Sequence, residues 1–230
     1  TKIIPSHTFA KNEYVNMEAD LQIKNYDGDH YYMWDAQEQY WKGHEWWSAN
    51  KDQPVLNYAS NGNYAKSNAD PRYYNESYPG NGISNPATHT PCKDLPNANE
   101  LSWYAMYGDP RWDADELWTT MGHLYKGGMW FKKRSVLIAD GKYSTEKSAD
   151  GTTDLRTTYK FYSNNNSSIN SGLPSAADAN KYFYLPALGY YNSGQLNNVG
   201  VVGYYWSSSA YPFGADNAYR LSFDSGVYVG

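Results

Sequence analysis

The apolar part of this chain consists largely of aromatic side chains that also carry a polar group. The 230 residues include 25 tyrosines and 9 tryptophans but only 6 phenylalanines. Tyrosine and tryptophan tolerate a half-buried position, because one end of the side chain is apolar and the other can bond to water. Aromatic residues are enriched in strands, whereas asparagine and glycine favour turns. The composition therefore disfavours a helical bundle and predicts short strands joined by long loops.

Length and charge restrict the classes of protein further. A chain of this length can bury a full core, and we expect one domain over residues 1–230. The formal net charge is −5, and the longest basic run, Lys132 to Arg134, is too short for a nucleic-acid footprint. No run of about 18 apolar residues occurs, so no membrane span is predicted. Thr1 resembles a processed start without a signal peptide, and any lipid anchor would lie outside this chain.

Three parts of the domain differ in composition. Residues 1–90 are rich in aromatic and turn residues, which predicts one or two strands followed by long irregular loops. Residues 91–181 carry the helix signals and a loop insertion. Residues 182–230 combine strand candidates with Tyr, Ser, Asn, Asp and Gly, which are typical of adaptable binding surfaces. We therefore expect an α+β fold with two helices, short antiparallel strands and long loop insertions, and a binding region at 182–230.

Local signals place these elements along the chain. Asn97, followed by a glutamate three residues later, forms a capping-box pattern that predicts a helix through about Tyr107. Asp113 is followed by a glutamate in the same way and predicts a second helix ending near Gly122. Strands are predicted at 129–138, 203–208, 218–223 and 227–229, with a pair formed by 157–162 and 182–185. Turns are predicted at 192–194 and 224–226.

Motifs for a metal, a thiol pair or a nucleophile are incomplete. His44 and its glutamate neighbour begin a zinc-protease pattern, but Ser48 stands where the second histidine is needed. Cys92 is the only cysteine, which excludes an intramolecular disulfide, a cysteine-type zinc site and a thiol pair. The acidic run at 25–29 lacks an EF-hand glycine, because His30 follows it, so a solvated turn is the better interpretation. We predict no metal, no cofactor and no catalytic residue.

The C-terminal part of the chain resembles a family of bacterial surface proteins. The run LPALGYYNSGQLNNVGVVGYYWSSS at 185–209, followed by NAYRLSF at 217–223, resembles the C-type-lectin-like "major paralogous" domain of surface lipoproteins. LPNANELSWY at 95–104 is similar to the start of that family's helix. The blocks at 31–46 and 108–133 look like a gut-bacterial lipoprotein subgroup of the same family. The resemblance implies a C-type-lectin-like fold in a protein that is secreted or held at the cell surface.

The same run also resembles variable proteins of diversity-generating retroelements. In those systems mutagenesis at adenine changes asparagine codons to Tyr, Asp, Ser, Phe, Ala, Arg or Gly codons, among others, and the positions after Ser209 hold this set. Alternation with constant-looking neighbours would suit a strand with one displayed face. The expected ligand-binding residues are Tyr211, Phe213, Ala215, Asp216, Asn217, Tyr219, Arg220, Ser222, Asp224 and Tyr228. Trp206 and either Tyr204 or Tyr205 are expected to be buried beneath them.

The resemblance implies a non-enzymatic binding protein of the adhesin or receptor type, whose ligand is a protein or a glycan. Calcium-lectin signatures are absent, so calcium-dependent sugar binding is not implied. One alternative is a structural or fimbrial subunit whose loops pack against neighbouring copies. The other is an enzyme related to formylglycine-generating oxidases, which share this architecture but work through a cysteine pair. Cys92 has no such partner, which disfavours the enzyme.

Overall fold

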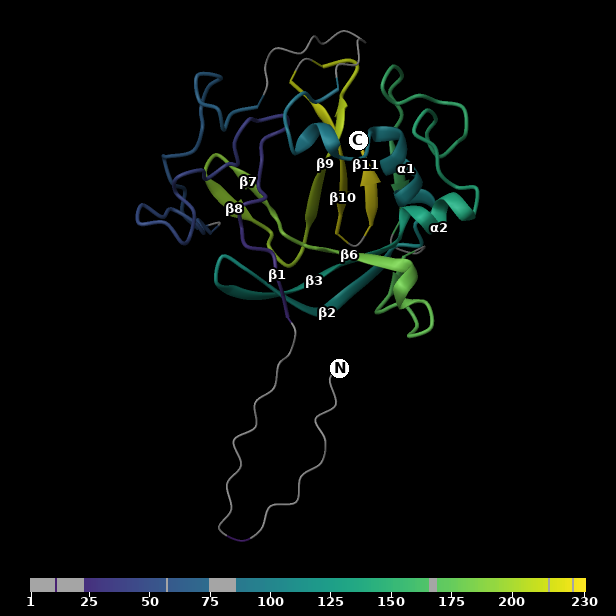
Figure 1. Ribbon diagram of the computed structural model, residues 1–230, viewed down its shortest axis with the longest axis horizontal. Helices are drawn as coiled ribbons and strands as arrows, with labels where there is room; N and C mark the ends of the chain where they lie inside the picture. The colour runs from purple at the N-terminus through teal and green to yellow at the C-terminus, as the bar shows by residue number, and fades with distance from the viewer. Residues whose placement is uncertain are drawn as a thin grey trace.

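The computed structural model describes residues 11, 23–56, 58–74, 86–165, 169–214, 216–224 and 226–230. This part of the chain has two α-helices and three sheets, which agrees with the predicted α+β class. Figure 1 shows a larger sheet below a four-stranded sheet, with both helices on one side of the molecule. The β7–β8 hairpin and the described loops between residues 26 and 74 lie on the opposite side. Neither helix of the described chain is long and apolar enough to cross a membrane.

The larger sheet is mixed and is built around a long hairpin. The hairpin strands β2 (Arg111–Thr120) and β3 (His123–Lys132) are antiparallel, and β6 (Tyr182–Pro186) pairs antiparallel with β3. The short strands β1 (Lys24–Asn25) and β5 (Asn170–Ser171) both run parallel to β2. The strand predicted at 182–185 is therefore confirmed, but its expected pairing with 157–162 is wrong.

The helix predicted to begin at Asp113 is wrong, because this segment is strand β2. Asp113 Oδ1 accepts hydrogen bonds from the backbone N–H groups of Asp115 and Glu116 at 3.0 and 3.1 Å, as a helix cap would. Here these bonds close a turn at an irregularity in the β2–β3 register. Trp118 is fully buried and donates to the Gly127 carbonyl at 2.9 Å. Pairing with β3 and burial of Trp118 therefore override the local cap signal.

The smaller sheet is antiparallel and carries the C-terminal strands. Its order is β4 (Tyr162–Asn164), β11 (Val227–Val229), β10 (Ala218–Phe223) and β9 (Gly203–Ala210). The strands predicted at 218–223 and 227–229 are confirmed, and the strand predicted at 203–208 continues to residue 210. Because β4 pairs with β11, the segment near 162 belongs to this sheet.

Helix α1 (Ala98–Tyr107) begins where the sequence predicts. Asn97 Oδ1 accepts from the Glu100 backbone N–H at 3.0 Å, and Glu100 Oε2 accepts from the Asn97 N–H at 2.7 Å, which completes a capping box. Leu101 and Tyr104 of α1 join the main core with the inner face of the smaller sheet. Helix α2 (Arg134–Ala139) replaces the second half of the strand predicted at 129–138, since pairing ends at residue 132.

The remaining elements are short and hold the long loops. Strands β7 (Tyr190–Asn192) and β8 (Gln195–Asn197) form a hairpin whose turn residues Ser193 and Gly194 both have positive φ, 49° and 78°. This is the turn predicted at 192–194. The 3₁₀ turns cover Cys92–Asp94 and Ala179–Lys181. The described loops between 26 and 74 contain a separate aromatic core, which fits the irregular structure expected there.

Candidate functional site

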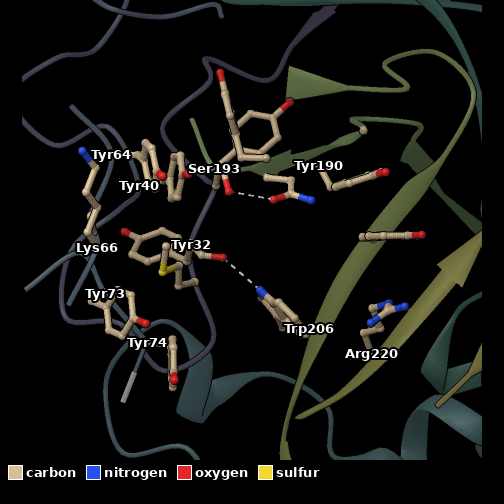
Figure 2. A pocket seen from close by; sticks show the side chains of 17 residues that line it. Tyr32, Tyr40, Tyr64, Lys66, Tyr73, Tyr74, Tyr190, Ser193, Trp206 and Arg220 are labelled. Atoms are coloured by element: carbon tan, nitrogen blue, oxygen red, sulfur yellow. Dashed lines mark hydrogen bonds between the residues drawn. The ribbon is translucent and has the colours of Figure 1, made fainter. Parts of the chain in front are cut away.

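A cleft of about 560 Å³ lies between the N-terminal loops and one end of the smaller sheet. Its volume is within the range of roughly 300–1,000 Å³ found for small-ligand sites. Figure 2 shows Tyr32 and Tyr64 on one wall of the cleft, and Tyr190, Trp206 and Arg220 on the other. Nine of the seventeen lining residues are tyrosines. The cleft therefore presents mainly flat apolar rings with hydroxyl groups.

Long-range hydrogen bonds join the two walls. The Trp206 indole N–H donates to the Tyr32 carbonyl at 2.9 Å, which Figure 2 shows as a dashed line. One residue pair further along, the Trp34 indole N–H donates to the Ser207 carbonyl at 2.8 Å. The Tyr31 hydroxyl donates to the Leu188 carbonyl at 2.7 Å. In each bond the donor belongs to an aromatic side chain and the acceptor is a backbone carbonyl. Because neither group has much freedom to move, these bonds fix the distance between the two walls.

The floor at the N-terminal side is a cluster of tyrosine rings. Tyr191 of β7 stacks on Tyr40 at 5.0 Å between ring centroids and meets Tyr31 edge to face at 4.9 Å. The Tyr40 hydroxyl accepts the Gly194 N–H at 2.9 Å, so the hairpin tip is held on the same cluster. Burial raises the pKa of Tyr31 well above its usual value and also raises the pKa of Tyr40. Both hydroxyls therefore stay neutral at physiological pH.

The opposite wall is a three-layer stack on the outer face of the sheet. Tyr204 of β9 stacks on Tyr190 of β7 at 4.8 Å, with 17° between the ring planes. The Arg220 guanidinium carbon lies 4.6 Å from the Tyr204 ring centre, on a cation–π contact. In the sheet register Arg220 stands directly opposite Trp206. Strand pairing thus places one cation beside two aromatic side chains of the same wall.

Three of the predicted ligand-binding residues share this outer face. Ser222 lies opposite Tyr204 on one side and Tyr228 on the other, and Arg220 follows the same alternation. Tyr228 is half-buried and stacks on Phe161 with 22° between the planes. Of the three, only Arg220 lines the cleft itself.

The other predicted residues lie around the turns that join these strands. Phe213 is 59% exposed, and Asp216 and Asn217 are also exposed. Asp216 lines a smaller cavity of about 160 Å³ that shares Trp206 with the main cleft. Tyr211 is half-buried against the core. Asp224 accepts the Gly226 N–H at 2.8 Å in the β10–β11 turn, and Ala215 lies outside the described residues.

The expectation that Tyr219 lies on the displayed face is wrong. Tyr219 is fully buried and belongs to the main core together with Leu221 and Phe223. A strand sends alternate side chains to opposite faces, so Arg220 on the outside requires its neighbour to point inward. Trp206 and either Tyr204 or Tyr205 are expected from the sequence to lie buried beneath this face, and the structure agrees only in part. Tyr205 points inward and donates its hydroxyl to the Pro186 carbonyl at 2.6 Å, whereas Tyr204 is 39% exposed. Trp206, expected to be buried, is only half-buried, and it forms part of the cleft wall.

Sequence reasoning missed the whole N-terminal wall of the cleft. The residues that line it include Tyr32, Tyr64, Lys66, Tyr73 and Tyr74, whereas the sequence predicts only long irregular loops in this part of the chain. The density of tyrosine between 26 and 74 is a signal for binding chemistry. The sequence does not show that this segment packs against strands more than 100 residues away.

A second cavity, of about 630 Å³, borders β9 and is mainly apolar. Leu101, Leu185 and Leu188 are among the residues that line it, and Cys92 lies at its side. Burial raises the pKa of the Cys92 thiol to about 12, so the thiol is protonated and a poor nucleophile. Within the described ranges no three His, Cys, Asp or Glu side chains are grouped as a metal site would require.

Comparisons with protein-family models, with curated proteins and with solved structures give no match. The chemistry of the site must therefore be inferred from its own geometry. Ring faces, neutral hydroxyls and cations converge in the cleft, and these groups bind ligands by stacking, hydrogen bonding and charge.

Proposed function

We propose that this chain is a non-enzymatic ligand-binding protein of C-type-lectin-like fold, of the adhesin or receptor type, that acts at the cell surface or in secreted form. Its ligand, a protein or a glycan, binds in the tyrosine-lined cleft. The outward positions of β10 and the loop before it are the part that a diversity-generating retroelement would vary. This assignment follows the resemblance of residues 185–223 to such proteins.

The observation that carries the proposal is the position of Arg220. The sequence marks this residue as part of a displayed face, and it stands in the wall of the cleft, stacked on Tyr204. Binding sites concentrate their energy in a few anchors, among which tyrosine, tryptophan and arginine are enriched. Tyr204, Trp206 and Arg220 provide one of each in adjacent register positions.

The test is a screen of the purified chain on a combined array of glycans and surface proteins, followed by affinity measurement on each hit. Tyr204→Ala removes the central ring of the stack, and because Tyr204 is partly exposed the fold is retained. We expect a loss of affinity of about 30-fold or more, as for an anchor residue. Tyr219→Phe is the matched control, since it alters a tyrosine of the same sheet on its buried face. Hits that bind Tyr204→Ala and the wild type equally would refute the proposed site.

A structural subunit that assembles with copies of itself is the second candidate. Tyr159, Phe161 and Phe213 are 47%, 50% and 59% exposed, and Tyr211 and Tyr228 contact this group, which makes an aromatic surface outside the cleft. Apolar patches of this kind can mark protein interfaces. Sedimentation velocity over a range of concentrations would separate the candidates. Concentration-dependent assembly that Phe161→Ser abolishes, without any foreign ligand, would favour the subunit.

A further inference from the structure

The charged side chains that line the cleft are both positive. Lys66 comes from the N-terminal wall and Arg220 from β10, and no aspartate or glutamate is among the lining residues. The chain as a whole has a net charge of −5. The side chains that line the cleft therefore carry a net positive charge in an acidic protein, which favours an anionic ligand.

Arg220 differs from the other arginines of the chain. Four of the five arginines lie within 3.9 Å of a carboxylate oxygen. These pairs are Arg72–Asp70, Arg111–Asp109, Arg134–Glu100 and Arg156–Asp154. Arg220 has Ala218 in the place where three of these pairs have the aspartate, and among the described residues it forms no ion pair. As far as the described ranges show, its guanidinium can therefore donate to a carboxylate from outside.

One donor of Arg220 also lacks an acceptor among the described residues. Its Nε is shielded from solvent and has no hydrogen-bond partner in the described part of the chain. A buried donor without an acceptor is costly, so an acceptor supplied by a ligand would be bound favourably. The side chain is held instead by the face of Tyr204 at 4.6 Å, and Lys66 similarly lies 5.1 Å from the ring of Tyr64. Aromatic rings therefore hold the Arg220 and Lys66 side chains in place and leave their N–H groups available to a ligand.

The form of the walls favours a saccharide over an extended peptide. A pyranose ring presents an apolar face and a rim of hydroxyls, which matches tyrosine faces and tyrosine hydroxyls. A peptide that binds by adding a strand would need a free strand edge, and backbone groups at both ends of the β9 edge beside the cleft are already bonded. Ala87 N–H donates to the Ser208 carbonyl, Ser208 N–H donates to the Pro96 carbonyl, and Gly189 N–H donates to the Val202 carbonyl at 2.7 Å.

We propose that the cleft binds an acidic saccharide, a sugar bearing a carboxylate, with the carboxylate on the Arg220 guanidinium and the sugar ring against the tyrosine walls. The inference rests on the proposed binding function and adds the class of ligand. A planar carboxylate matches the two parallel N–H donors of a guanidinium, which a lysine ammonium cannot reproduce. Lys66 adds positive charge at the opposite wall.

The experiment uses matched pairs of saccharides that differ only in charge. Oligogalacturonate, oligoglucuronate and sialyllactose are each compared with their methyl esters by calorimetric titration of the full chain. We expect at least one acid to bind about 10-fold or more tightly than its ester. Arg220→Met should cost the acid more affinity than the ester and so remove this preference, and Arg220→Lys should restore only part of it. Circular dichroism and the unfolding midpoint verify that each variant folds.

The outcomes distinguish this inference from the proposed function. If every ester binds as tightly as its acid, or if Arg220→Met keeps the preference, the acidic ligand is refuted. If neutral glycans or proteins then bind the wild type and lose affinity with Tyr204→Ala, the binding function stands alone. Preference for a glutamate-rich peptide over every acidic sugar would also overturn the saccharide. A chain that binds no probe on the array or in titration would refute both.

Discussion

Tyr219→Phe should stabilise the protein, because it removes a buried hydroxyl that is not well hydrogen-bonded. Tyr219 is fully buried, and its hydroxyl makes no hydrogen bond of ordinary geometry in the described part of the chain, although burial raises its pKa and the Lys160 backbone lies near enough to lower that pKa in part. Leaving such a group unpaired costs about 1–3 kcal/mol. Phenylalanine retains the ring and its contact with Tyr211, whose centroid lies 5.7 Å away, so little packing is lost. We expect the free energy of unfolding to rise by about 1 kcal/mol, which corresponds to about 2–4 °C in Tm for a domain of this size.

Guanidinium chloride unfolding followed by tryptophan fluorescence measures this change as a higher midpoint at an unaltered slope. Tyr219→Ala is the companion variant, and loss of the whole ring from the core should cost about 3–5 kcal/mol. A decrease of 1 kcal/mol or more for Tyr219→Phe would mean that the hydroxyl is bonded. A cost below 1 kcal/mol for Tyr219→Ala would mean that the ring is exposed. Either result would contradict the inward orientation derived for this residue.

Three further predictions test the core, the helix cap and the titrating groups. Asn97→Ala should lower the free energy of unfolding by about 1 kcal/mol through loss of the capping box, while Asn97→Ser should retain most of it; equal losses in the two variants would refute the cap. Gly203→Ala should lower that free energy by about 1–3 kcal/mol, because the new methyl would overlap the buried Phe223 ring; an unchanged thermal midpoint would contradict this packing. Burial raises the pKa of Tyr26 to about 12, above its value of 10.0 in the unfolded chain, so its contribution to stability is complete below pH 10 and is lost as pH rises toward 12. Urea unfolding at pH 8, 10 and 11 tests this, and equal stability throughout would refute it.

The capping-box pattern occurs twice in the sequence, and it predicts a helix correctly at one place and wrongly at the other. Asn97 and Asp113 both precede a glutamate by three residues, and both accept backbone hydrogen bonds as a helix cap does. Only Asn97 begins a helix. The residues after Asp113 pair with strand β3, and the side chain of Trp118 is buried in the protein. A capping pattern concerns only the first turn of the backbone. Whether the segment becomes a helix or a strand depends mainly on which side chains it can bury.

The candidate site also has features that the sequence predicts and features that it does not. Turn signals and alternation give the bounds of β10 and β11, and they give a displayed face, but not which phase of the alternation faces outward. Tyr219 and Arg220 are adjacent and both suit a binding surface, so only the position of the core decides between them. The tyrosines of the opposite wall cannot be assigned from the sequence, because contacts between 31–74 and 189–220 depend on tertiary packing.

The bonds that join the walls of the cleft also determine when the cleft can form during folding. The Trp206–Tyr32 and Trp34–Ser207 bonds connect residues 174 and 173 positions apart. Closing loops of that length is slow relative to local helix and hairpin formation. The α1 cap and the β2–β3 hairpin can therefore assemble early, whereas the cleft requires both ends of the chain to be docked. A ligand that bridges the walls would bind only the completed molecule and would stabilise that last step by mass action.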